Sequence, residues 1–145
     1  MREILFKAKR IDNGEWVEGS LIDLDIDSGY CYIVPPYKKA SILPINFLIT
    51  DRMKLVAPET LCQLTGLCDK NGNKIWENDI LMAHLDEFYP EDTTCETVEW
   101  GFAGFVVHEA NSTDREYLDK FDLENFEVVG NIFDNKELLQ EESDE

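Results

Sequence analysis

The sequence predicts a mainly β protein, and three observations lead to this fold class. Apolar and charged residues alternate along short runs such as REILFKAKR, a period of two that is typical of half-buried strands. Turn signals, such as DNG at 12–14 and Asn71-Gly72, separate these runs. No apolar stretch approaches the roughly 20 residues that a membrane helix needs. We therefore expect an N-terminal β-rich segment over 1–57, a barrel-like β region over 58–134 and an acidic tail over 135–145.

The first segment should contain two strand pairs. The runs REILFKAKR and WVEGSLIDL form a hairpin around the DNG turn, and LIDLDIDSGYCYIV supplies a second pair. In that second pair three acidic residues occupy alternate positions and so share one solvent face: Asp23, Asp25 and Asp27. A calcium loop is the alternative, but Gly29 is one place late and Val34 replaces the closing glutamate.

The second segment should begin with a short helix. The tripeptide PET at 58–60 suits a helix start and Gly66 suits a C-terminal cap, which predicts a helix or helical turn over 58–65. Strands should follow at NKIWENDILMAHL, at ETVEWGFAGFVVHEA and at FEVVGNIF. The run at 114–121 is a short helix or a loop, and the tail from about Asn135 should be frayed.

The formal net charge of −18 is concentrated in the second part of the chain. Residues 1–60 hold 9 acidic and 8 basic side chains, whereas residues 61–145 hold 22 acidic and 5 basic, a net of 17 negative charges. Such a surface repels phosphate groups, so DNA or RNA binding is disfavoured. A protein partner with a basic surface is favoured, and a second copy of the chain is the other partner that we consider.

Cysteine usage and the start of the chain predict a cytoplasmic protein. The four cysteines form no CxxC pair and no short secreted framework. The opening MREILFKAKR has no apolar run resembling a signal peptide. A reducing setting without membrane contact is therefore expected.

The stretch DKNGN is either a metal loop or a turn between strands. Asp69, Asn71 and Asn73 alternate as in a calcium loop, but such a loop needs glycine at its sixth position and glutamate at its twelfth. Here Gly72 is fourth and Ile80 is twelfth. Asn71-Gly72 is instead among the best hairpin dipeptides, because both residues tolerate the positive φ of a type I′ turn. We predict a tight turn.

No catalytic, cofactor or metal site is predicted elsewhere. A zinc site would need His84 and His108 together with distant cysteines, and no ligand spacing indicates one. A nucleophilic pair of Cys95 and His108 stays open, because catalytic partners meet in space, but its local signature is absent. Glu77 and Asp79 are expected to be structural or surface groups. We therefore expect a protein without enzymatic activity.

The run DEFYPEDTTCETVE at 86–99 is the candidate partner-binding surface, because it holds six acidic and no basic side chains. A contact with a basic partner is the functional interpretation, and a solvated loop is the alternative. Acidic neighbours over 109–127 would extend the surface. The three tryptophans could line a ligand groove, but we expect them in the core. The candidate binding residues are Glu87, Glu91, Asp92 and Glu96.

Five motifs span almost the whole chain in order: REILFKAKR, EWVEG at 15–19, PETLCQLTGLCDKNGNKIWENDIL at 58–81, VEWG at 98–101 and EVVGNIFDN at 127–135. Together they resemble the YopX family of phage and prophage proteins. The third motif is the most specific of them. The chain departs from the family pattern at Lys7 and Lys9, where arginine and tryptophan are usual. The acidic stretches at 86–96 and 111–125 look particular to this chain.

The resemblance implies a small, mainly β protein encoded in a phage or prophage genome, with an SH3-like barrel in its second half. It implies no established activity and supplies no catalytic residue. We therefore expect a non-enzymatic protein of the host cell cytoplasm that contacts a protein partner through an acidic surface. A DNA-mimicking inhibitor of a host nucleic-acid-binding enzyme is the alternative.

Overall fold

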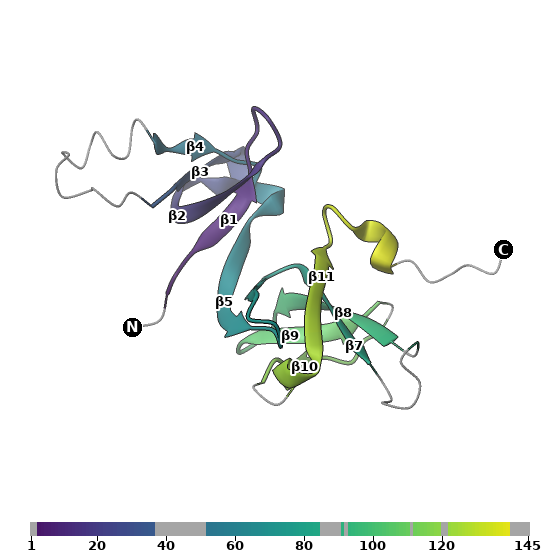
Figure 1. Cartoon of the computed structure of the whole chain (residues 1–145). Coiled ribbons are helices and arrows are strands. Elements are labelled where there is room, and N and C mark those ends of the chain that lie inside the picture. Colours follow the sequence, from purple (N-terminus) through teal and green to yellow (C-terminus); the bar gives the residue numbers. More distant parts are fainter. Residues whose placement is uncertain are drawn as a thin grey trace. The chain divides into compact units, whose positions relative to one another are not determined.

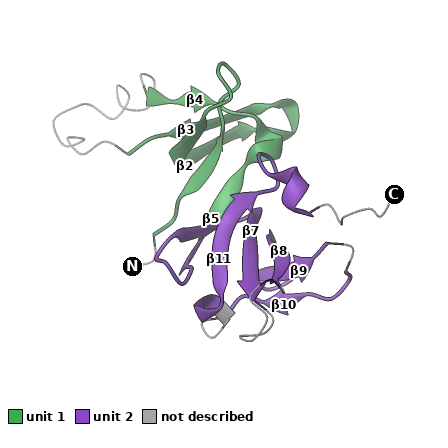
Figure 2. Cartoon of the chain, turned by 45° about the vertical axis from the view of Figure 1, so that its right-hand side comes forward, with its two compact units in different colours: residues 1–64 green, residues 65–145 purple. Residues whose placement is uncertain are grey.

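The chain forms two compact units, residues 1–64 and residues 65–145 (Figure 2). Both units are built from antiparallel strands and short 3-10 turns, which confirms the mainly β prediction. No helix in the described part of the chain has the length and hydrophobicity that crossing a bilayer requires. The computed structural model describes residues 3–36, 52–84, 91, 93–110, 112–119 and 122–139.

The N-terminal unit is an antiparallel sheet with the strand order β4-β3-β2-β1-β5 (Figure 1). The predicted hairpin is present, because β1 pairs with β2 around the turn at 12–14. The turn η1 (Ile26–Ser28) joins β2 to β3. The strands are β1 (Phe6–Lys9), β2 (Trp16–Asp25), β3 (Tyr30–Val34), β4 (Lys54–Leu55) and the beginning of β5 (Cys62–Cys68).

Alternation along β1 divides this sheet into two faces. Ala8 is fully buried in a cluster with Cys31, Ile33 and Val56. Lys7 and Lys9 point the other way, as neighbours in a strand must. On that face their ammonium groups lie 4.8 and 5.4 Å from the ring centroid of Trp16, close enough for cation–π attraction.

The C-terminal unit contains a five-stranded antiparallel sheet with the order β10-β9-β8-β7-β11 (Figure 1). The last residues of β5 and the short β6 (Lys74–Trp76) precede it as a hairpin. Among the described residues no pairing joins the edge strands β10 and β11, so this sheet does not close. Its strands are β7 (Asp79–His84), β8 (Thr93–Trp100), β9 (Phe105–Glu109), β10 (Glu116–Tyr117) and β11 (Phe126–Asn131).

One face of this sheet forms the core of the unit, and the other carries polar groups. The core cluster consists of Ile75, Leu81, Ala83, Val98, Val107, Leu123 and Phe126. On β8 and β9, Thr97 and His108 are directly opposite one another and alternate with the buried valines. They therefore lie on the outer face.

The helix predicted over 58–65 is wrong beyond its first turn. Pro58–Thr60 forms the 3-10 turn η3, and the chain then enters β5, where Cys62 pairs with Lys7 of β1. Gly66, the predicted cap, lies inside β5 with a φ of 86°. Pairing with β1 satisfies backbone groups and buries Cys62, and this tertiary gain outweighs the local preference.

The run at 114–121 and the start of the predicted tail form short, irregular elements. The run at 114–121 contains the two-residue strand β10, followed by η4 (Asp122–Glu124). Of the predicted tail, residues 136–139 form the 3-10 turn η5 (Lys136–Leu139), with Leu138 exposed. Residues 140–145 lie outside the described residues.

Candidate binding surface

The structure describes two of the four acidic residues that the sequence predicts as a binding surface, Glu91 and Glu96. Glu91 is exposed in a turn before β8, whereas Glu87 and Asp92 lie outside the described residues. Glu96 is half-buried on β8, directly opposite Glu109 of β9, and the Glu109 carboxylate accepts a hydrogen bond from Thr94 Oγ1 at 2.9 Å. The structure therefore brings Glu96 together with one predicted neighbour from 109–127.

Exposed aromatic side chains occur on both faces of the sheet at the end of the β8–β9 hairpin, because Trp100 is paired with Phe105 and Tyr117 with the next residue of β9, Val106. Phe102, in the connecting turn, is fully exposed, and Trp100 and Tyr117 are 58% and 55% exposed. The Trp100 ring meets Phe105 edge-on, with ring centroids 4.9 Å apart. We call this group, Trp100, Phe102, Phe105 and Tyr117, the aromatic tip.

Neighbouring elements hold the aromatic tip together. Gly101 N–H donates to the Gly104 carbonyl at 2.7 Å, which closes the hairpin. Tyr117 of β10 is paired with Val106 of β9, and a Cβ on Gly104 would lie 3.7 Å from the Tyr117 ring. Tyr117 therefore lies beside the hairpin although it is distant from Trp100 in sequence.

Acidic residues are neighbours of the aromatic tip along the chain. Glu116 and Asp119 are exposed on either side of Tyr117 in the chain, and Glu99 precedes Trp100. An apolar centre inside a charged rim is the usual anatomy of a protein interface. This surface, and not the predicted run at 86–99 alone, is the best candidate for binding.

The carboxylate of Glu99 is part of a polar network on the outer face. Arg115 Nε donates to Glu99 Oε1 at 2.5 Å, and His108 Nε2 lies 3.1 Å from Glu99 Oε2. His108 Nδ1 lies 3.0 Å from the Glu109 carbonyl oxygen. Both ring nitrogens face acceptors, so both contacts are hydrogen bonds only when each nitrogen carries a proton.

This network argues against the nucleophilic pair of Cys95 and His108. Both ring nitrogens of His108 already face oxygen acceptors, whereas a general base needs a free lone pair toward the thiol. Burial raises the pKa of Cys95, the opposite of the activation that a catalytic thiol needs. All four cysteines are free.

The predicted turn at 69–73 is confirmed, and Asp69 organises it. Asp69 Oδ1 accepts the amides of Asn71 at 2.9 Å and Asn73 at 2.8 Å, and Oδ2 accepts the Val128 amide at 2.9 Å. The type I′ detail is wrong, because only Gly72 has a positive φ, at 82°, while Asn71 does not. Gly72 N–H bonds to the Asp69 carbonyl, as in a type I turn that ends in a glycine bulge.

The environment of Asp69 shifts its pKa. Burial alone would raise the pKa, but the hydrogen bonds from Val128, Asn73 and Asn71 stabilise the carboxylate, and the net effect lowers the pKa. Asp79 is also buried and accepts the Trp76 amide at 2.8 Å. Both carboxylates thus organise turns. No three His, Cys, Asp or Glu side chains in the described ranges converge as a metal site requires.

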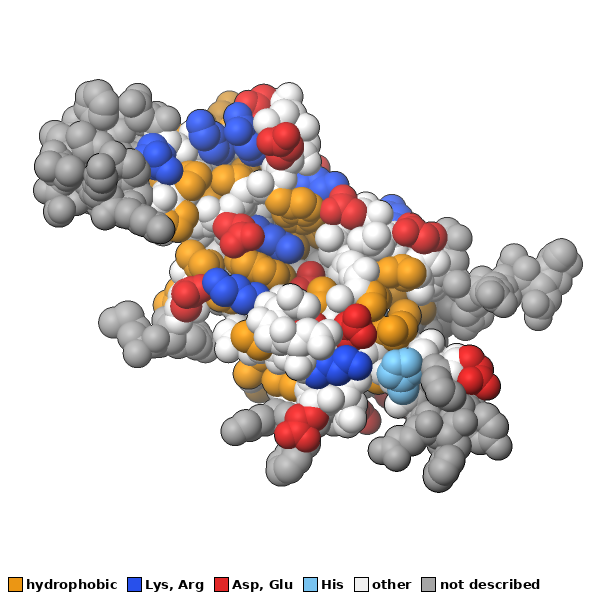
Figure 3. Space-filling model, viewed as in Figure 1, with side chains coloured by type: hydrophobic (Ala, Val, Ile, Leu, Met, Phe, Trp, Pro, Cys, Tyr) orange, Lys and Arg blue, Asp and Glu red, His pale blue; other side chains and the backbone are white. Residues whose placement is uncertain are grey.

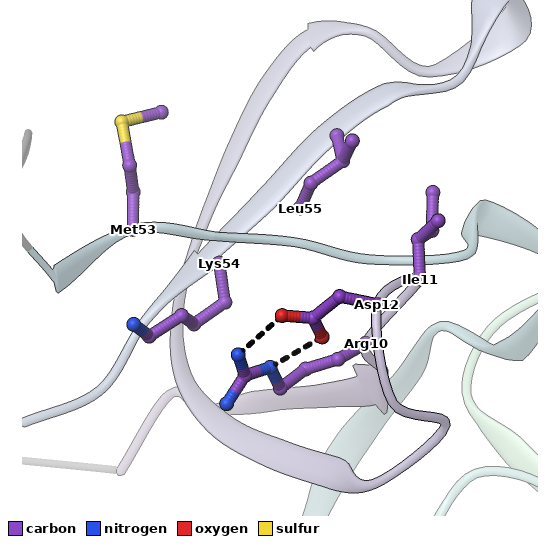
Figure 4. A pocket seen from close by; sticks show the side chains of 6 residues that line it. All are labelled: Arg10, Ile11, Asp12, Met53, Lys54 and Leu55. Carbon is purple, nitrogen blue, oxygen red and sulfur yellow. Dashed lines mark hydrogen bonds and ion pairs between the residues drawn. The ribbon is translucent and has the colours of Figure 1, made fainter.

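The N-terminal unit has a smaller hollow of about 290 Å³ (Figure 4). Arg10 faces Asp12 there through two hydrogen bonds of 2.9 and 2.6 Å. This pairing raises the pKa of Arg10 and lowers the pKa of Asp12. Because the pair neutralises itself, the hollow offers a weaker site than the C-terminal unit does. The lining residues are Arg10, Ile11, Asp12, Met53, Lys54 and Leu55.

The aromatic tip was not predicted from the sequence. Only Trp76 of the three tryptophans is buried, so the expectation that they lie in the core is wrong for Trp100. A signal was present in WGFAGF at 100–105, where aromatic residues flank two glycines, a pattern that suits an exposed hairpin end. Tyr117 carried no such signal, because only the fold brings it beside the hairpin.

Comparison with known proteins gives a family and a fold. No curated protein matches the chain. Among solved structures, protein EF1440 from Enterococcus faecalis is similar, with 24% sequence identity and a TM-score of 0.57 over 97% of this chain and 100% of that one. At this identity the likeness concerns the fold. The model of the YopX protein family matches residues 5–140. The chain therefore belongs to the YopX family.

Proposed function

We propose that the chain works by binding a protein partner with a basic surface, without catalysis, through the aromatic tip and its acidic rim. The exposure of Trp100, Phe102 and Tyr117 at one hairpin end is the observation that carries this proposal. Large aromatic side chains seldom gather in water on a monomer, and they dominate the energetics of interfaces.

The energies involved give the aromatic and the acidic side chains different roles in binding. Full burial of one aromatic side chain contributes about 1.5–3 kcal/mol, so three contribute several kcal/mol toward an association cost of about 4–15 kcal/mol. Exposed ion pairs contribute about 0–1 kcal/mol each. The aromatic tip would thus supply affinity, and the 17 net negative charges of residues 61–145 would speed the approach of a basic partner.

The DNA-mimicking alternative has less support. A mimic presents free carboxylates in a continuous row, but Glu99 is held by Arg115, and Lys70 Nζ lies 3.8 Å from Glu127 Oε2. In Figure 3, basic, apolar and neutral groups separate the described acidic side chains on the face in view. An aromatic tip also has no role in imitating a phosphate backbone.

We also infer three finer properties from the family membership and the composition. The C-terminal sheet would be an SH3-like barrel, the gene would come from a phage or prophage, and the protein would act in the host cytoplasm. The order of antiparallel strands in this sheet supports the first of these, and an experimental structure of the C-terminal unit would test it.

A pull-down from lysogenic host lysate tests the proposed function. Phe102→Ser combined with Tyr117→Ser should abolish recovery of the partner, because the apolar centre of the contact is lost. Leu24→Ser is the matched control, since Leu24 is an exposed apolar residue of the N-terminal unit. Changing Glu87, Glu91, Asp92 and Glu96 to Gln or Asn should slow association at low salt.

Three outcomes would contradict this proposal. The first is equal recovery of the same partner by the double variant and the wild type. The second is a recovered partner whose contact surface is acidic. The third is a self-association, measured by analytical ultracentrifugation, that the double variant abolishes, because the aromatic tip would then bind a second copy of this chain.

A further inference from the structure

A groove of about 650 Å³ lies on the outer face of the five-stranded sheet. Its floor is the outward side of β8 and β9, and the chain from 131 to 139 forms one wall. The volume falls in the range of small-ligand sites. The lining residues are Asn78, Thr97, Glu99, His108, Ile132, Phe133, Lys136 and Leu139.

Hydrogen bonds fix the wall of the groove. Asn131 Oδ1 accepts the amides of Phe133 and Asp134, each at 2.9 Å. The Ile132 amide donates to the Asn78 carbonyl at 3.0 Å, and the Asn131 amide donates to Asn135 Oδ1 at 3.1 Å. These hydrogen bonds fix the backbone that carries Ile132 and Phe133.

The floor contains a polar group without a partner. Thr97 is 8% exposed and lines the groove, and no described residue forms a hydrogen bond with its hydroxyl. The Thr97 hydroxyl is thus available to a ligand group that enters the groove.

The local charge of the groove differs from that of the chain. The Glu99 carboxylate is bound by Arg115 and faces His108. Lys136 has no acidic partner among the described residues and lines the groove. The Debye length is about 8 Å at physiological salt, so distant carboxylates are largely screened from this site. The ammonium group of Lys136 is therefore the positive charge that the lining offers to a ligand.

We propose that this groove binds an apolar group that carries a carboxylate. Lys136 and the Thr97 hydroxyl would hold the carboxylate, and Ile132, Phe133 and Leu139 would pack against the apolar part. One ammonium group matches one carboxylate charge. A phosphate dianion would bring a second negative charge that the single ammonium group of Lys136 does not balance. The ligand is either a small organic acid or the C-terminal residue of a peptide.

A titration followed by ¹⁵N–¹H NMR of the full chain tests the proposal. The probes are N-acetyl-leucine, its amide, and an acetylated tripeptide ending in leucine with a free carboxylate. We expect the free acids to shift the amides of Thr97, His108 and Ile132, with the amide at least about tenfold weaker because the charge-assisted hydrogen bond is lost. Tighter binding of the tripeptide would identify a peptide end as the ligand, and tighter binding of N-acetyl-leucine would identify a small acid.

Two variants locate the contact. Lys136→Met should weaken the binding of the free acids about five- to tenfold and leave the weak binding of the amide unchanged. Thr97→Val should weaken it several-fold without loss of stability, because no hydrogen bond of the described residues is broken. Lys74→Met, on β6 outside the groove, is the charge-matched control. Equal binding of acid and amide, an equal effect of Lys74→Met, or no shift below about 10 mM of any probe would overturn the proposal.

Discussion

Asp69 is a carboxylate that is only 6% exposed and accepts backbone amides from both sides of its own turn and from β11. Asp69→Asn keeps the shape but removes the charge, and it replaces one of the two accepting oxygens with a nitrogen that cannot accept a backbone amide. We expect a loss of about 2 kcal/mol in the free energy of unfolding. Urea denaturation followed by circular dichroism measures it. Asp114→Asn, at an exposed position, is the control and should change little.

The lowered pKa of Asp69 also predicts how stability depends on pH. The folded state binds this proton less readily than the unfolded chain does. The stabilisation is therefore fully present above the ordinary pKa of about 4 and is lost as the pH falls through the lowered value. Between pH 5 and 2 the wild type should lose more stability than Asp69→Asn does. Parallel curves for the two proteins would contradict this assignment.

Gly72 tests the turn in another way. Nothing lies within 4 Å of a Cβ placed at this glycine, but its φ is 82°. The cost of a side chain is therefore conformational and not steric. Gly72→Val should destabilise the fold by about 1 kcal/mol or more, whereas Gly72→Asn should cost less, because asparagine tolerates this conformation. An unchanged melting temperature for the valine variant would refute the prediction.

Local sequence revealed part of this turn. The Asn71-Gly72 dipeptide predicts a hairpin because its preference depends on neighbouring residues alone. The role of Asp69 was not predictable, because its partner Val128 is 59 residues away. Contacts of this kind exist only once the sheet has formed.

At the scale of elements, Gly130 determines how the chain leaves β11. A register shift marks the strand between Val128 and Gly130, as in a β-bulge. A Cβ on Gly130 would collide with the Asn135 carboxamide, which accepts the Asn131 amide. Gly130→Ala should therefore release the 131–139 wall and speed hydrogen exchange at the Asn131 amide by about tenfold or more.

Gly104→Ala is the matched control for that experiment. A Cβ there would meet the Tyr117 ring at 3.7 Å, an ordinary van der Waals contact. Hydrogen exchange at Asn131 should stay at the wild-type rate in this variant. If both alanine variants speed exchange equally, the effect is general destabilisation and not the loss of the Asn135 contact.

The strands were more predictable than the helix because in the strands the local sequence pattern agrees with the tertiary packing. Alternation in FKAK of β1 matches the burial of Ala8 between the exposed-face lysines. At 58–65 the local signals favour a helix, but pairing of Cys62 with β1 decides the conformation. The prediction of a short helix or a loop over 114–121 missed β10 for the same reason, since Tyr117 becomes a strand residue only beside Val106.

At the scale of the whole molecule, the 17 net negative charges of residues 61–145 should repel one another. The Debye length falls from about 30 Å at 0.01 M salt to about 3 Å at 1 M, so added salt screens this repulsion more strongly. The melting temperature should therefore rise by several degrees between 10 mM and 1 M sodium chloride. Scanning calorimetry measures this rise. Sodium chloride should have no such effect on a variant in which exposed acids are replaced by glutamine.

Charge asymmetry was visible in the sequence, whereas the surfaces suited to binding were not. Acidic and basic residues can be counted along the sequence without knowledge of the fold. The aromatic tip combines residues of β8, β9 and β10, and the groove combines β8 and β9 with residues 131–139. Both surfaces form only when the strands are arranged in the sheet, so the linear sequence does not predict them.

The three tryptophans occupy three different environments, so the intrinsic fluorescence of the protein can report on the aromatic tip. Trp76 is buried, the Trp16 ring contacts two lysine ammonium groups, and Trp100 is exposed to solvent. Emission from Trp100 should be red-shifted and readily quenched by neutral acrylamide, whereas iodide should quench it poorly because the acidic rim repels the anion. A partner that covers the aromatic tip would shift this emission to the blue, so the proposed contact can be followed without any label.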